Sequence, residues 1–183
     1  MADVSPTLFA FTTKYKGLRN ILENKILLAE AFDPNDKTIS PRWLEFNCLW
    51  DTGATNTVIS SKVASDLGLK PTGKAICHTA GGQRIVNTYL VNIRLPNRVA
   101  FVALRVTEAN ISEPFDALIG MDIISKGDLA ITNADGATWM SYQLPSNERI
   151  DFVSAITRKK QVQNADEKRK ARNKRKREAK RGK

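Results

Sequence analysis

Residues 43–59 read WLEFNCLWDTGATNTVI and contain an acidic turn between two apolar segments. From 43 to 50 the side chains alternate as expected for a half-buried strand, and residues 57–59 are again apolar and β-branched. The tripeptide at 51–53, Asp-Thr-Gly, is by itself a common turn. Because this turn lies between two apolar strands, we expect Asp51 to be carried into a partly buried site instead of facing water.

A second short motif, apolar-apolar-glycine, lies at Leu118-Ile119-Gly120 and precedes a short helical segment. A loop that presents a carboxylate, with a glycine-ended strand passing beneath it, is what half of an aspartic protease site requires. The hydroxyl of Thr52 is expected to lock the loop, while Gly53 lets the backbone approach closely.

The other apolar segments predict an all-β chain with one or two short helices. The segment 17–32 is also compatible with an amphipathic helix, but a strand from Lys25 is preferred because the segments around it are strands. A helix capped by Ser60 or Ser61 is expected to end at Gly68. Further strands are expected at Leu8–Tyr15, Lys74–Thr79, Arg84–Leu95, Val99–Val106, Leu129–Thr132 and Thr138–Leu144, and a second short helix at Met121–Lys126.

The charge of the chain is concentrated at its C-terminal end. The whole chain holds 29 Lys and Arg against 19 Asp and Glu, a formal net charge of +10. Residues 158–183 hold 14 basic and 3 acidic side chains, a net of +11, which leaves a net of −1 for residues 1–157. We therefore expect one domain at 1–155, with an N-terminal extension at 1–40 that is itself β, and a basic tail at 156–183 that is helical or disordered.

Composition excludes several classes of protein and site. No apolar run approaches the roughly 20 residues that span a bilayer, and the N-terminus lacks the basic and apolar regions of a secretory signal. Cys48 and Cys77 show no metal-ligand spacing, and His78 is the single histidine. We expect a soluble, cytoplasmic protein without a metal or a cofactor, with Cys48 in its core and His78 in a structural or exposed position.

With these motifs, the body resembles the retropepsin-like aspartic proteases, the single-domain relatives of pepsin that include the retroviral proteases. The resemblance covers about Trp43 to Leu144 and follows the order DTGATNTVIS, SSKVASDLGL, HTAGGQR and ALIGMDII. It is closer to cellular or bacterial members than to retroviral ones. The resemblance implies a closed β-barrel of the acid protease type.

The resemblance also implies an aspartic endopeptidase with Asp51 as its catalytic residue. Two carboxylates must share one proton in such a site, since two like charges a few Å apart cannot both ionise. One acts as a base toward a water molecule, and the other protonates or hydrogen-bonds the scissile carbonyl. The chain holds one Asp-Thr-Gly motif and is too short for a second lobe, so Asp51 of a second copy is expected across a two-fold axis.

Supporting roles follow from the same resemblance. The active-site loop would be supported by Thr52, Gly53, Leu118, Ile119 and Gly120. The glycine-rich hairpin is expected to close over an extended peptide as a flap. The substrate-binding positions are then Ala54, Thr55, Ala80, Gly81 and Gly82.

Two positions depart from the retroviral pattern. Retroviral members usually carry Asp at the position of Thr55 and Arg at that of Met121, and those two side chains pair with each other. Both partners are missing here, so no unpaired buried charge is left. The change is typical of a non-retroviral branch.

The tail indicates a second kind of partner. Lys168–Lys180 contains nine cations and one acid, Glu178, with no aromatic residue. Such a segment, continued to Lys183, binds nucleic acid or another polyanion through phosphates without base readout, or serves only as a solubilising tail. The alternative function is a catalytically silent peptide-binding or dimerisation module with a nucleic-acid-binding tail. Retention of Asp51 in its motif favours the enzyme, and no membrane partner is expected.

Overall fold

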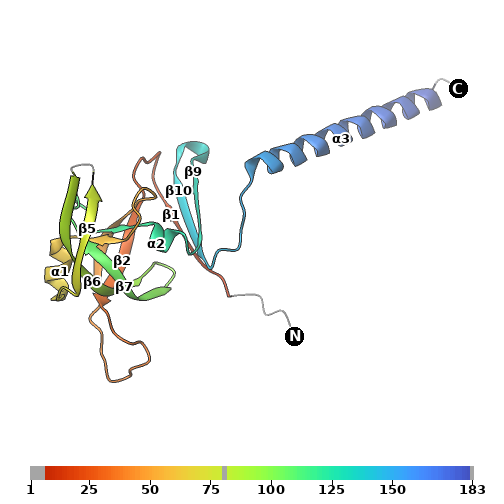
Figure 1. The fold of residues 1–183 in the computed structure, drawn as a ribbon. Coiled ribbons are helices and arrows are strands. Elements are labelled where there is room, and N and C mark those ends of the chain that lie inside the picture. Colours follow the sequence, from red (N-terminus) through yellow and green to blue (C-terminus); the bar gives the residue numbers. More distant parts are fainter. Residues whose placement is uncertain (1–6, 80–81, 182–183) are drawn as a thin grey trace. The chain divides into compact units, whose positions relative to one another are not determined.

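Seven strands of the first unit, Met1–Asn147, are hydrogen-bonded in the order β2-β3-β8-β4-β7-β6-β5. They are β2 (Glu23–Glu30), β3 (Leu44–Trp50), β4 (Val58–Ile59), β5 (Gly73–Thr79), β6 (Gly82–Arg94), β7 (Ala100–Glu108) and β8 (Ala117–Ile119). Figure 1 labels four of them, β2, β5, β6 and β7. Since β2 also pairs with β6, the strands from β2 to β6 in this order close into a barrel, and β5 continues beyond it as the partner of β6. The prediction of a mainly β chain with a closed barrel is confirmed.

The computed structural model describes residues 7–79 and 82–181, and the side chains of residues 7–77 and 82–173. The chain forms two compact units, Met1–Asn147 and Glu148–Lys183. Within the described chain, no helix is long and apolar enough to cross a bilayer.

The alternation seen in the sequence places one face of each barrel strand in the core. In β3, Phe46, Cys48 and Trp50 are buried, while Glu45 and Asn47 are exposed and Leu49 is half-buried. The strand preferred for the segment before it is confirmed, because residues 23–28 of β2 pair antiparallel with β3. The fully buried aliphatic side chains of the core include Leu28, Ile59, Val91, Ile93, Val106, Ile119 and Ile123.

Two short helices follow the strands of the site. In α1 (Ser61–Leu67), the hydroxyl oxygen of Ser60 accepts a hydrogen bond from the Val63 amide, so Ser60 is the cap. Gly68 ends this helix with a φ of +67°, as predicted. The second helix, α2 (Met121–Ile124), is shorter than the predicted Met121–Lys126 and has Ser125 as its C-terminal cap. After the cap, the amides of Lys126 and Gly127 donate to the carbonyls of Ile123 and Ile124.

A second, three-stranded sheet has the order β1-β10-β9 and is antiparallel throughout. Its strands are β1 (Phe9–Lys14), β9 (Asp128–Thr132) and β10 (Trp139–Leu144), and the turn η1 (Ala134–Gly136) joins the last two. One face of this sheet packs on the end of β3: the rings of Phe11 and Tyr142 lie 5.9 and 5.0 Å from that of Trp50. The sheet therefore lies against the residue that precedes Asp51.

The second unit consists of the helix α3 (Phe152–Arg181) and the short segment before it. Its first turn is held by Asp151, whose carboxylate accepts hydrogen bonds from the amides of Val153 and Ser154 at 2.9 and 3.1 Å. Of the two forms expected for the tail, the structure has the helix.

Candidate active site

The loop that follows β3 folds back on its own carboxylate. Asp51 Oδ1 accepts a hydrogen bond from the amide of Gly53 at 2.8 Å, and the Asp51 carbonyl accepts one from the amide of Ala54 at 3.2 Å. A Cβ at Gly53 would lie 3.1 Å from the same Oδ1, closer than side chains normally approach. Because residue 53 has no side chain, its backbone amide can approach the Asp51 carboxylate and hydrogen-bond to it. The Asp51 side chain is half-buried.

The glycine-ended strand β8 passes directly beneath this loop. It runs parallel to β3, with Trp50 opposite Ile119, and the Ile119 carbonyl accepts the Asp51 amide at 3.0 Å. Gly120 is pressed against the loop backbone, because a Cβ there would lie 2.5 Å from the carbonyl carbon of Asn56. The structure therefore brings the segment Leu118–Gly120 under the Asp-Thr-Gly loop, with a contact that only glycine permits at 120.

A buried polar relay ties the two motifs together. The amide of Gly120 donates to Thr57 Oγ1 at 3.3 Å, and the Thr57 hydroxyl donates to Asp122 Oδ1 at 2.8 Å. Asp122 Oδ2 also accepts the Thr57 amide at 3.0 Å, and its Oδ1 accepts the Ile123 amide at 3.0 Å. Asp122 lies in the first turn of α2, where an acidic residue is favourable, but the sequence did not reveal its link to Thr57.

Backbone hydrogen bonds also join the positions that distinguish this chain from retroviral proteases. The Met121 amide donates to the Ala54 carbonyl at 2.8 Å, and the Asp122 amide donates to the Thr55 carbonyl at 3.1 Å. Thr55 and Met121 are both exposed, so no side-chain pair is needed to connect loop and helix here. Thr52 is exposed as well, and its hydroxyl has no hydrogen-bond partner among the residues that the structure describes.

The predicted flap corresponds to the hairpin of β5 and β6, which stay paired as far as Thr79 and Gly82. Ala80 and Gly81, two of the predicted substrate-binding positions, lie outside the described residues. Gly82 opens β6 with a φ of +105°, a conformation that favours glycine. The side chain of His78 is likewise outside the described part of the chain.

The hairpin carries an exposed apolar pair. Ile76 of β5 and Ile85 of β6 are directly opposite in the ladder, so their side chains share one face, and they are 64% and 72% exposed. The sequence predicted both strands but not this exposure, since alternation alone does not tell which face of a projecting hairpin is covered.

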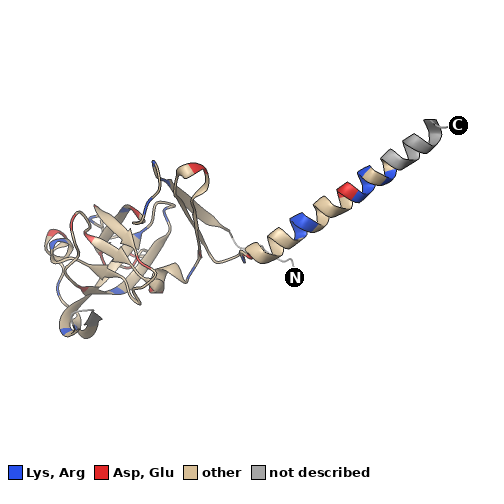
Figure 2. Cartoon of the chain, turned by 90° about the horizontal axis from the view of Figure 1, so that it is seen from above, with Lys and Arg blue, Asp and Glu red and all other residues tan. Residues whose placement is uncertain are grey.

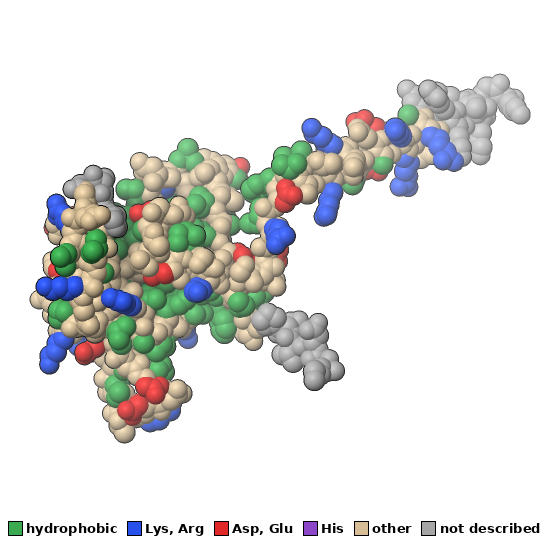
Figure 3. All heavy atoms as spheres, viewed as in Figure 1, with side chains coloured by type: hydrophobic (Ala, Val, Ile, Leu, Met, Phe, Trp, Pro, Cys, Tyr) green, Lys and Arg blue, Asp and Glu red, His purple; other side chains and the backbone are tan. Residues whose placement is uncertain are grey.

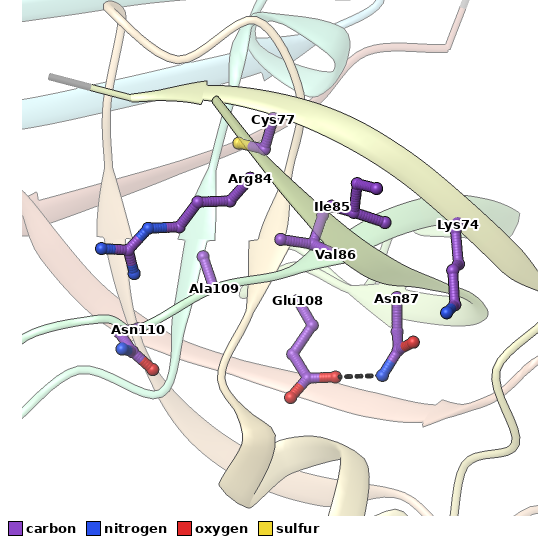
Figure 4. A pocket seen from close by; sticks show the side chains of 9 residues that line it. All are labelled: Lys74, Cys77, Arg84, Ile85, Val86, Asn87, Glu108, Ala109 and Asn110. Atoms are coloured by element: carbon purple, nitrogen blue, oxygen red, sulfur yellow. Dashed lines mark hydrogen bonds between the residues drawn. The ribbon is translucent and has the colours of Figure 1, made fainter. Parts of the chain in front are cut away.

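A cavity of about 490 Å³ lies where β6 separates from the barrel (Figure 4). Pairing between β6 and β7 begins only at Thr88 and Thr107, so in the described structure residues 83–87 of β6 pair with β5 alone. The carboxylate of Glu108, one of the lining residues, accepts hydrogen bonds from Asn87 at 3.1 Å and from the Tyr89 hydroxyl at 2.7 Å. The lining residues are Lys74, Cys77, Arg84, Ile85, Val86, Asn87, Glu108, Ala109 and Asn110.

The two cysteines differ in their surroundings. Cys48 is completely buried beneath the loop, and burial raises the pKa of its thiol far above the ordinary value, which confirms its expected place in the core. Cys77 is partly exposed in the hairpin. Over the part of the chain that is described, no group of His, Cys, Asp and Glu could hold a metal ion.

The solved structures to which the chain is similar include three proteases or protease-like domains, each at low identity. EIAV protease in complex with the inhibitor HBY-793 is 22% identical with a TM-score of 0.42, covering 61% of this chain and 91% of that chain. A retropepsin-like aspartic protease from Rickettsia conorii is 12% identical with a TM-score of 0.43, and the match covers 76% of this chain and 98% of that chain. The retroviral protease-like domain of Ddi1 from Leishmania major is 17% identical with a TM-score of 0.35, and the match covers 58% of this chain and 90% of that chain.

Comparison with curated proteins gives no match. Comparison with family models gives one, described as aspartyl protease, over residues 43–123. That segment contains the Asp51 loop, the hairpin of β5 and β6 and the glycine-ended strand β8. The predicted resemblance to the retropepsin-like aspartic proteases is confirmed, and residues 43–123 carry it.

Proposed function

We propose that the chain is an aspartic endopeptidase that acts as a homodimer, with Asp51 of each copy in one catalytic dyad. The observation that carries this proposal is the position of Asp51. Its carboxylate accepts a hydrogen bond from the Gly53 amide, and its loop lies on Ile119 and Gly120. A peptide-binding module would need the fold but no carboxylate at this position.

The chemistry follows from two carboxylates that share one proton. One Asp51 takes a proton from a water molecule as the water oxygen attacks the scissile carbonyl carbon, and the other donates its proton to the carbonyl oxygen. The tetrahedral species then collapses and the carbon–nitrogen bond breaks. The leaving amine takes the proton that the first Asp51 removed from water, and the second Asp51 takes back a proton from a hydroxyl of the tetrahedral species. One copy supplies a single such loop, so activity requires the second.

The open edge of the three-stranded sheet supports this assembly. Within the described structure β9 pairs with β10 on one side only, and Ile131 on β9 is 46% exposed. An exposed strand edge is a ready template for pairing with another chain. The sheet packs on Trp50, next to Asp51, so pairing of β9 with its copy across a two-fold axis would bring two Asp51 loops toward each other.

The hairpin of β5 and β6 supports binding of an extended peptide. The edge of β6 at 83–87 has backbone groups free to add a strand beside the cavity, and such addition is a common way of holding peptides. The exposed pair Ile76 and Ile85 would contact apolar side chains of the substrate. We infer a preference for extended, apolar peptide segments.

Cleavage of a peptide library by the wild type and by Asp51→Asn tests the proposal. The substitution keeps the size of the side chain and the acceptor for the Gly53 amide, so the fold should survive. We expect cleavage by the wild type alone, inhibited by pepstatin. A folded wild-type dimer that cuts nothing would favour the catalytically silent peptide-binding module, and cleavage by Asp51→Asn would exclude Asp51 as the catalytic residue.

A further inference from the structure

The helix α3 has a charge density that the proposed protease does not use. From Lys168 to Lys180 there are nine cations and one acid, and the segment belongs to a helix that the structure describes as far as Arg181. Residues 148–173 of the second unit are all exposed. The cations whose side chains the structure describes, from Arg158 to Arg172, therefore face solvent.

The cations surround the helix instead of forming one stripe. Successive residues of an α-helix are about 100° apart, so Lys168, Arg169 and Lys170 point to three different sides. Arg158, Lys159 and Lys160 do the same earlier in the helix. Blue side chains accordingly leave the described part of α3 in several directions (Figure 3), and the cartoon shows Lys and Arg in two stretches of the helix with an acidic stretch between them (Figure 2).

This distribution disfavours a flat partner. A helix that lies in a membrane surface needs an apolar face along its length, beside its cations. The exposed large apolar residues of α3, Phe152, Val153, Ile156 and Val162, precede the dense basic segment. Between 163 and 181 the only apolar residues are alanines. A flat anionic surface would also leave the cations on the opposite side unpaired.

A groove between two rows of phosphates fits the same distribution. The major groove of duplex DNA is about 12 Å wide and admits an α-helix, so cations on both sides of the helix meet phosphates of both strands. Single strands are less suitable, since residues 153–183 contain no aromatic side chain on which bases could stack. We propose that α3 binds a nucleic-acid duplex through its phosphates, with Lys168–Arg181 as the main contact.

Binding should also stabilise the helix. Lys168 and Arg172 are four residues apart, and like charges at this spacing repel each other on a helix surface. Phosphates that neutralise them remove this repulsion. The helical signal in circular dichroism should therefore rise when a duplex is added.

Fluorescence anisotropy of the full chain with a duplex DNA, a duplex RNA and a single strand of equal length tests the proposal. If about five phosphates are neutralised, the affinity for duplex should fall by about 500-fold between about 50 and about 200 mM salt. Asp51→Asn should bind like the wild type, so that this result does not depend on the proposed protease activity.

Two triple variants with the same change of net charge form the matched pair. Replacing Lys168, Arg169 and Lys170 with Gln should weaken duplex binding at least tenfold. The slope of the logarithm of the binding constant against the logarithm of the salt concentration should become shallower by about 2 to 3. Replacing Arg158, Lys159 and Lys160 with Gln should have a clearly smaller effect on both. Preference for either duplex over the single strand supports the proposal.

Three results would overturn the proposal. They are no duplex binding at the lowest salt, equal losses in the two triple variants, and a preference for the single strand. Tighter binding to vesicles of anionic phospholipid than to duplex would assign the helix to a membrane surface instead.

Discussion

The hydroxyl of Thr57 and the carboxylate of Asp122, 65 residues apart in the chain, are joined by a hydrogen bond of 2.8 Å. Thr57 is completely buried, and its oxygen also accepts the amide of Gly120. One hydroxyl therefore connects the strand after the Asp51 loop to the helix after β8. Its loss should loosen the support of the Asp51 loop.

Thr57→Val should lower the free energy of unfolding by about 1 to 3 kcal/mol, because the buried Gly120 amide loses its acceptor and Asp122 Oδ1 keeps only the Ile123 amide as a donor. Thr57→Ser keeps the hydroxyl and should cost clearly less. Chemical denaturation of the two variants measures the difference. Equal stability of Thr57→Val and wild type would show that the relay contributes nothing.

Ile131→Glu should weaken the proposed homodimer at least tenfold, since a carboxylate on the β9 edge would face its copy near the two-fold axis. Val102→Glu is the control: Val102 is 45% exposed, against 46% for Ile131, and lies on β7. Sedimentation velocity at several concentrations measures both. If the two variants dimerise alike, the interface lies elsewhere.

Ile85→Ser should reduce kcat/KM for apolar peptides by about 10- to 100-fold, the worth of one isoleucine side chain buried against substrate. The exposed fraction of Ile85, 72%, means that folding stability should change little. Val102→Ser serves as the matched control. Unchanged kcat/KM in Ile85→Ser would separate this face of the hairpin from the substrate.

Iodoacetamide should modify Cys77 and spare Cys48 in the native protein. The thiolate is the reactive form, and burial both raises the pKa of Cys48 and blocks access to it. Mass spectrometry should find one modified cysteine before denaturation and two after it. Modification of both at similar rates would mean that β3 opens readily beneath the Asp51 loop.

The strands of the barrel are predictable because one buried face imposes a period of two, as in β3 with Phe46, Cys48 and Trp50. The contact between β2 and β6 that closes the barrel cannot be predicted in this way. It joins segments more than sixty residues apart, Leu28 opposite Ile93, and no local pattern selects that partner among several apolar strands.

The candidate site follows the same division. The Asp51 loop and the glycine at 120 carry local signals, a turn motif and an apolar-glycine step. Thr57 and Asp122 each look ordinary in the sequence, as a strand residue and a residue of a first helical turn. Only the folded chain places them within hydrogen-bond distance.

Mixing wild type with a growing excess of Asp51→Asn tests the central claim most directly, that one active site contains Asp51 from two chains. The variant should capture wild-type chains in mixed dimers that have one carboxylate, so the cleavage rate should fall toward zero as the variant is added. In the absence of variant, the rate in dilute solution should rise with the square of the protein concentration. A rate that is unchanged by the variant and proportional to wild-type concentration would contradict the account.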